Sequence, residues 1–257
     1  MKNWRPCVFA GLIAVFFAFT ACSNGSTSND DDDSLGSREN PYLVKITGAY
    51  DTYDILDEIN AKGGYVALDL SEVTGFWGFQ YTFNDGREKV VSLILPDNFT
   101  SNMIPPFAFP CFTEIISVTI PNTVTNIGQS AFQECTSLTN VTIPDSVIIV
   151  GDTAFFGCGF ANVTIPSSVT SIGINAFYGC SNLKTVTILR SSVTHGSITT
   201  LGSAYSFTDT HSDLRIIVPT GNANAYRGDL SWDYEIKRIH NIDCTLPNPA
   251  LLSCSCL

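Results

Sequence analysis

The sequence predicts an elongated solenoid, mostly β with some helix, in which six or seven coils of about 23 residues stack between two caps. Three observations support this fold class. One motif recurs in register from Ile116 to Leu189, apolar residues alternate with threonine at the start of each copy, and glycine and proline recur at fixed places. A fixed period in this range is typical of repeats that bury their apolar faces only by stacking on one another.

The repeat reads V-T-I-P-x-x-V-x-x-I-G-x-x-A-F-x-x-C-x-x-L. Its Val-Thr-Ile start occurs at Val118, Val141, Val163 and Val186. Leu189 replaces the proline in the last copy, and one copy is a residue shorter where Phe160 lies in a reduced spacer. A motif this long that recurs in register is a specific signal of a repeat protein.

This motif closely resembles the BspA-type leucine-rich repeats of bacterial cell-surface proteins, among them spirochaetal leucine-rich repeat lipoproteins. With degenerate copies counted, the resemblance covers residues 68–218. It implies a leucine-rich repeat solenoid, α+β but mostly β, that serves as an adhesin or surface protein rather than as an enzyme. No cofactor and no metal are predicted for this chain.

The side chains at the start of each repeat alternate between the interior and the surface. In the stretch from Val118 to Ile120, the two apolar residues are expected inside and Thr119 outside. Pro121 is expected to end the strand. Gly128 and its counterparts in the other coils are expected to occupy sharp bends with positive φ.

The recurring phenylalanines allow two interpretations, a stacked core or a ligand box. We favour a core, because each ring buries a large apolar area when successive coils stack. The rings concerned are Phe132, Phe155 and Phe177.

The recurring cysteines invite a metal site, a disulfide or buried thiols. The residues are Cys111, Cys135, Cys158 and Cys180. A single file with one thiol per coil, about 4.8 Å apart, cannot converge on one zinc ion. A disulfide between neighbouring coils is within reach of the backbone, but small, buried, apolar thiols are the favoured interpretation.

Residues 1–22 are expected to be a lipoprotein signal peptide. A short basic start precedes the apolar run from Val8 to Phe19, which is too short for a comfortable membrane span. The run leads to Ala21 and Cys22, which resembles a lipobox with Cys22 as the acylated residue. Phe19 stands where the family pattern has leucine, so ordinary signal cleavage after Ala21 is the competing interpretation.

The remaining segments divide the chain further. Residues 23–40 form a flexible acidic tether whose aspartate run lacks the spacing of a calcium loop. Residues 41–67, with two strands and a helix, form an N-terminal cap. The solenoid spans 68–218 and a C-terminal cap spans 219–240. Residues 241–257 are a tail of unknown role.

Composition excludes several classes of function. Without the basic residues of the signal, 11 Lys and Arg remain against 24 Asp and Glu, which argues against nucleic acid and anionic lipid as partners. The three histidines lie outside the regular repeats, and neither a zinc-binding histidine pair, a nucleophile elbow nor a phosphate loop occurs in the sequence. No catalytic residue is therefore predicted.

The outward positions of the strands are the candidate ligand face. The residues are Thr119, Thr142, Thr164, Thr187, Asn140 and Asn162. They predict a flat, uncharged, hydrogen-bonding surface suited to a protein or glycan ligand of a host or of other bacteria. The competing explanation is that threonine is present only because β-branched residues favour strands.

Two functions are consistent with these features. The first is a surface-anchored, adhesin-like binding protein held in the outer membrane or cell surface by its lipid anchor alone. The second is a periplasmic structural envelope lipoprotein without a host ligand.

Overall fold

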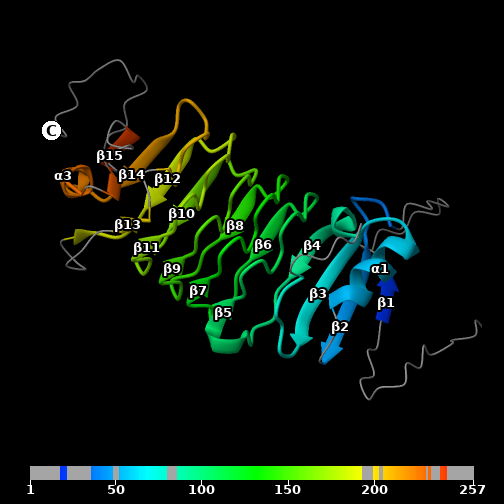
Figure 1. The fold of residues 1–257 in the computed structure, drawn as a ribbon. Coiled ribbons are helices and arrows are strands. Elements are labelled where there is room, and N and C mark those ends of the chain that lie inside the picture. The colour runs from blue at the N-terminus through cyan, green and yellow to red at the C-terminus, as the bar shows by residue number, and fades with distance from the viewer. Residues whose placement is uncertain are drawn as a thin grey trace, which may run out of the picture.

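The computed structural model describes residues 18–21, 36–48, 52–79, 86–192, 199–202, 205–229, 231–232 and 238–241. Its coils stack along one axis as a parallel, mostly β solenoid (Figure 1). Each regular coil contributes one strand to each of two sides, so the predicted fold class is confirmed.

On one side, strands pair in two sheets with the orders β1-β2-β3-β4-β6-β8 and β10-β12-β14-β15. These strands are β1 (Ala18–Ala21), β2 (Tyr42–Gly48), β3 (Val66–Val73), β4 (Val90–Ile94), β6 (Ser117–Thr119), β8 (Asn140–Thr142), β10 (Asn162–Ile165), β12 (Thr185–Ile188), β14 (Arg215–Val218) and β15 (Ile239–Asn241).

On the other side, five two-residue strands form a parallel sheet in the order β13-β11-β9-β7-β5. They are β5 (Met103–Ile104), β7 (Asn126–Ile127), β9 (Ile149–Val150), β11 (Ser171–Ile172) and β13 (Thr200–Leu201). Short 3-10 turns precede β4 and β5, at Arg87–Lys89 and Thr100–Asn102.

The N-terminal end is a β-α-β unit, as the sequence predicts. Helix α1 (Thr52–Lys62) connects the parallel strands β2 and β3, and buries Ile55, Leu56 and Ile59. Strand β1, which falls within the predicted signal peptide of residues 1–22, pairs antiparallel with β2 on the outer edge of this unit. Cys22, the predicted lipidation site, lies outside the described residues.

The predicted phenylalanine core is confirmed and extends into both ends of the chain. Phe155 is fully buried and stacks on Phe132 at 5.5 Å and on Phe177 at 5.4 Å between ring centroids. The complete phenylalanine ladder, with its terminal tryptophan, consists of Phe76, Phe109, Phe132, Phe155, Phe177, Phe207 and Trp232. One apolar stack therefore runs through the solenoid.

The expected positive φ at the repeat glycines is wrong. Gly128, Gly151 and Gly173 are absent from the residues with positive φ among those described; in each coil that conformation falls two residues later, at Ser130, Thr153 and Asn175. The glycines are required by close approach instead. A Cβ at Gly173 would lie 2.4 Å from the backbone nitrogen of Asp152, one coil earlier.

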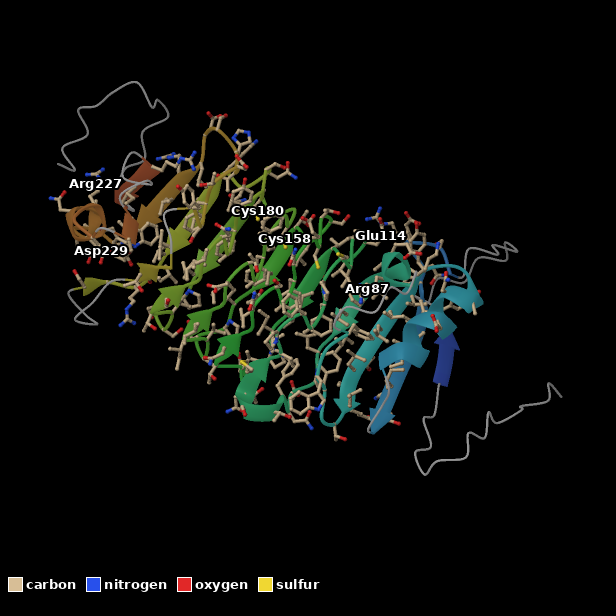
Figure 2. All side chains as sticks on the ribbon, in the orientation of Figure 1. Arg87, Glu114, Cys158, Cys180, Arg227 and Asp229 are labelled. Carbon is tan, nitrogen blue, oxygen red and sulfur yellow. The ribbon has the colours of Figure 1, made fainter. Side chains whose placement is uncertain are left out.

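The interpretation of the cysteines as buried thiols is confirmed for three residues and wrong for the fourth. Cys135, Cys158 and Cys180 are buried, and Figure 2 shows Cys158 and Cys180 in adjacent coils. Cys111 is exposed. The Cys111 amide donates to the Gln133 carbonyl in the next coil, just as the Glu134 amide donates to the Phe156 carbonyl one coil further on. Cys111 therefore occupies the position equivalent to Glu134, and Phe112 occupies the buried position that cysteine has in later coils. The cause is that Cys111 follows the ladder phenylalanine by two residues and not by three.

The C-terminal end closes the stack with aromatic residues. Helix α3 (Ala223–Arg227) buries Tyr226, whose hydroxyl donates to the carbonyl of Arg190 at 2.8 Å. The indole of Trp232 donates to the carbonyl of Thr199 at 2.8 Å. Strand β15 then pairs with β14. The sheet therefore includes Asn241, the first residue of the tail (residues 241–257) for which no role was predicted. Residues 242–257 lie outside the described part of the chain.

Candidate functional site: the outward strand face

The predicted ligand residues lie on the outer surface of β6, β8, β10 and β12, here called the strand face. Strand alternation places Val118 and Ile120 in the core, at 3% and 2% exposure, and turns Thr119 outward. Thr142 and Thr164 are exposed in the same way, and Thr187 is half-buried. The structure thus brings the sequence-predicted threonines to one side of the solenoid.

Parallel pairing keeps these residues in register. Thr119 pairs with Thr142 across β6 and β8, and Thr164 pairs with Thr187 across β10 and β12. A second polar row lies two positions earlier along the same strands. It contains Ser117, Asn140, Asn162 and Thr185, of which the first three are exposed.

The hydrogen-bonded sheet is interrupted in the middle of the strand face. Strands β8 and β10 are neighbours in the stack, but they belong to different sheets. The interruption coincides with the shortened repeat, in which the fully buried Phe160 packs edge-on against Phe155 and Phe177. Val141, beside the interruption, is only partly buried. The threonine row is therefore divided between two hydrogen-bonded sheets, with Thr119 and Thr142 in one and Thr164 and Thr187 in the other.

The strand face is suited to hydrogen bonding rather than to chemistry on a substrate. Hydroxyl groups both donate and accept, and the asparagine amides do the same. Stacked strands about 4.8 Å apart present these groups at a regular spacing. Such a surface can contact an extended polypeptide or glycan along its length.

The strand face continues toward the N-terminus in a way that was not predicted from the sequence. The outward row continues from Thr119 to Ile94, Asp69 and Lys45 on β4, β3 and β2. The Lys45 ammonium lies 2.7 Å from a Glu72 carboxylate oxygen and 4.0 Å from one of Asp69. The hydrogen bond to Glu72, with the charges of Glu72 and Asp69, raises the pKa of Lys45. This end of the face is charged, whereas the threonine rows are not.

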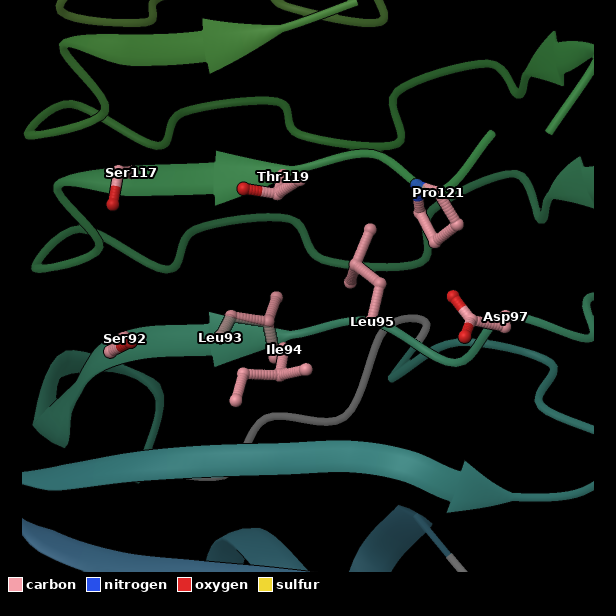
Figure 3. Close-up of a pocket in the computed structure, with 8 residues that line it drawn as sticks. All are labelled: Ser92, Leu93, Ile94, Leu95, Asp97, Ser117, Thr119 and Pro121. Atoms are coloured by element: carbon pink, nitrogen blue, oxygen red, sulfur yellow. The ribbon is translucent and has the colours of Figure 1, made fainter. Parts of the chain in front are cut away.

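A shallow hollow of about 320 Å³ lies between β4 and β6 on the same side (Figure 3). Its lining residues are Ser92, Leu93, Ile94, Leu95, Asp97, Ser117, Thr119 and Pro121. Ile94, which is 50% exposed, occupies the position that threonine has in later coils. Aligning Leu93-Ile94-Leu95-Pro96 with Val-Thr-Ile-Pro would have identified this position from the sequence.

Neither a metal centre nor a membrane-spanning helix is found in the described residues. No group of three or more His, Cys, Asp or Glu side chains in this part of the chain is placed to hold a metal ion. Nor does any described helix combine the length and apolar character needed to cross a membrane. Of the histidines, His195 lies outside the described residues, and His211 is near Asp213 at the surface, 3.9 Å away.

Comparison with protein families identifies the class of solenoid. Parallel coils, a buried phenylalanine in each repeat and two strands per coil define a leucine-rich repeat solenoid, which is typically a non-enzymatic interaction fold. Residues 102–223 match the model of the BspA type leucine rich repeat region in six copies. Residues 102–223 therefore form an array of BspA-type leucine-rich repeats.

Three solved structures illustrate the similarity. A leucine rich repeat protein of T. pallidum is 28% identical, with a TM-score of 0.44, over 51% of this chain and 60% of that one. A leucine-rich repeat protein of Eubacterium ventriosum is 23% identical, with a TM-score of 0.46, over 75% and 41%. A leucine rich cell surface protein of Faecalibacterium prausnitzii is 28% identical, with a TM-score of 0.32, over 48% and 32%.

The match therefore spans 60% or less of each of these three proteins, and none of them assigns a function to this chain. A search of the curated proteins found no significant match.

Proposed function

We infer that this protein is an exported, adhesin-like binding protein that holds a protein or glycan ligand on the strand face. The observation that carries this inference is the in-register pairing of exposed polar side chains, Thr119 with Thr142 and Ser117 with Asn140. Extended, regularly spaced surfaces of this kind are what solenoid proteins use for binding.

Anchoring at Cys22 is part of the same proposal. Acylation at this residue would hold the protein in the outer membrane or at the cell surface, because each buried CH₂ contributes about 0.8 kcal/mol to membrane binding. The predicted tether of residues 23–40 would then separate the solenoid from the lipid up to Gly36, which is buried and accepts a hydrogen bond from the Tyr65 amide. The acidic composition supports ligands other than nucleic acid.

A double substitution on the strand face tests the binding site. Thr142→Glu with Thr164→Glu places two charges on exposed positions of β8 and β10 and leaves the core unchanged. We expect the variant to keep the wild-type melting temperature and to lose binding to those host matrix proteins or glycans that the wild type captures in an array.

The matched control places the same two charges on the other side of the solenoid. Gln129→Glu with Ile149→Glu alters two exposed residues, one just after β7 and one on β9. This variant is expected to bind as the wild type does. If the folded Thr142/Thr164 variant also binds as the wild type does, the threonine rows are structural and the ligand site lies elsewhere.

Protease treatment of intact cells separates this function from that of a periplasmic envelope lipoprotein. A surface-exposed solenoid is cleaved by added protease without prior lysis. A protein that stays intact until the outer membrane is broken faces the periplasm, and this result would rule out an adhesin.

A further inference from the structure

The hollow between β4 and β6 differs chemically from the rest of the strand face. Its middle is apolar, because Ile94 replaces the outward threonine and is 50% exposed. Figure 3 shows Ser92 and Ser117 near one end of the hollow and Asp97 with Pro121 near the other. An exposed isoleucine beside hydroxyls and a single carboxylate is a mixed surface, with an apolar floor and one charged end.

Charges around the hollow are predominantly negative. Asp97 is exposed and is the charged residue among the eight that line the hollow. Across the strands, Ile94 pairs with Asp69, whose nearest cation, Lys45, is shared with Glu72. Three carboxylates and one ammonium group therefore lie along this part of the face, in a chain whose formal net charge is −11.

We propose that this hollow is a subsite for a lysine or arginine side chain of an extended polypeptide bound along the strand face. The aliphatic stem of the side chain would cover Ile94, and its charged head would reach Asp97. Long basic side chains bury their methylene groups on apolar surface while the charge stays in water. Ser92 and Ser117 would then hydrogen-bond the backbone of the peptide.

The proposal rests on the function inferred above and makes it more specific. It commits to a polypeptide with a basic residue, because the carboxylate attracts a cation, whereas a neutral glycan has no charge for it to attract and an acidic ligand would be repelled. Because the carboxylate is at the surface, its contribution to affinity should be modest and should weaken with salt.

The test uses the full chain labelled at isoleucine methyl groups and four synthetic peptides. Each peptide alternates serine and threonine and carries lysine, arginine, norleucine or glutamate at its centre. Titration is followed by the methyl signal of Ile94. We expect the lysine and arginine peptides to bind about two- to five-fold more tightly than the norleucine peptide at low salt. This preference should shrink at high salt, and the glutamate peptide should bind most weakly.

Two substitutions at equivalent positions provide the control. Asp97 follows Pro96, and Asp145 follows Pro144 two coils further along; both carboxylates are exposed. Asp97→Asn should abolish the preference for lysine over norleucine, whereas Asp145→Asn should preserve it. Ile94→Thr, which restores the residue found at this position in later coils, should weaken both peptides alike, with binding followed by tryptophan fluorescence.

The outcomes separate this proposal from the inferred function. Equal affinity for all four peptides, or an unchanged lysine preference in Asp97→Asn, overturns the basic-residue subsite and leaves the strand face as a binding surface. Failure of every peptide to bind at millimolar concentration overturns the subsite and also argues against a polypeptide ligand on this face. Tighter binding of the glutamate peptide than of the lysine peptide would likewise overturn the subsite.

Discussion

The thiol of Cys158 donates a hydrogen bond to the backbone carbonyl of Phe132, one coil earlier, at 3.1 Å. The same contact recurs from Cys180 to the carbonyl of Phe155, at 3.1 Å. Each thiol therefore occupies little space in the core and also satisfies a buried carbonyl of the neighbouring coil. This explains why a small side chain with a weak donor recurs at this position.

Stability should fall at alkaline pH because of these thiols. Burial raises the pKa of Cys135 and of Cys180 to about 12, from an ordinary value of 9.0, and raises that of Cys158 as well. As the pH rises, the unfolded chain therefore loses its thiol protons first, and the folded state loses stability from about pH 9 upward. For Cys135 and for Cys180, this shift should lower the free energy of unfolding by about 1 kcal/mol between pH 8.5 and 10, which denaturant titration measures.

Cys135→Ala provides the comparison for this pH dependence. The variant is expected to be less stable overall, but its unfolding free energy should fall less steeply between pH 8.5 and 10. Tyrosines, whose ordinary pKa is 10.0, begin to ionise in the same range, but they do so in both proteins, so the difference between the variant and the wild type isolates the thiol. Identical slopes for the variant and the wild type would contradict the assignment of this effect to a buried thiol.

Removal of one ring from the phenylalanine ladder should strongly destabilise the fold. Phe155→Ala deletes a fully buried ring between Phe132 and Phe177 and should cost about 3–5 kcal/mol. Thermal and denaturant unfolding measure this loss. The control is Phe156→Ala, since Phe156 is half-buried and stacks on Tyr178 outside the ladder. An unchanged melting temperature for Phe155→Ala would place this residue outside the core.

A methyl group at a repeat glycine should also destabilise the stack. Gly173→Ala would bring the Cβ to 2.4 Å from the nitrogen of Asp152, and overpacking of this kind typically costs about 1–3 kcal/mol. Gly228→Ala is the control, because its nearest non-neighbouring atom is 3.2 Å away and its φ of −84° is ordinary for alanine. Equal stability of the two variants would show that the coils can separate locally at no cost.

Loss of the proposed lipid anchor should release the protein from the membrane. Cys22→Ser removes the thiol that would be acylated, so the full chain should move from the detergent phase to the aqueous phase on partitioning. Ser23→Ala, next to the cleavage site, serves as the matched variant and should stay with the detergent. Continued partitioning of Cys22→Ser into detergent would contradict the lipobox interpretation.

The repeat itself could be predicted from the sequence with little ambiguity. The alternation in Val118-Thr119-Ile120 specifies which side chains are buried, because successive residues of a strand point to opposite sides. The spacing of Phe132 and Phe155 specifies stacking, because one coil advances the chain by one strand spacing. Local pattern and tertiary packing agree at these positions, and the threonines consequently reach the surface as expected.

Other features depend on contacts between coils, which a one-dimensional motif does not specify. Gly173 is required by the backbone of the preceding coil, and not by its own φ. Cys111 lies outside the row of buried thiols, because the hydrogen-bond register between coils, and not the residue type, decides which position faces the core. The interruption between β8 and β10, and the hollow over Ile94, likewise arise from how neighbouring coils of unequal sequence fit together. A repeat motif specifies each coil, but the fit between two coils is decided by packing in three dimensions.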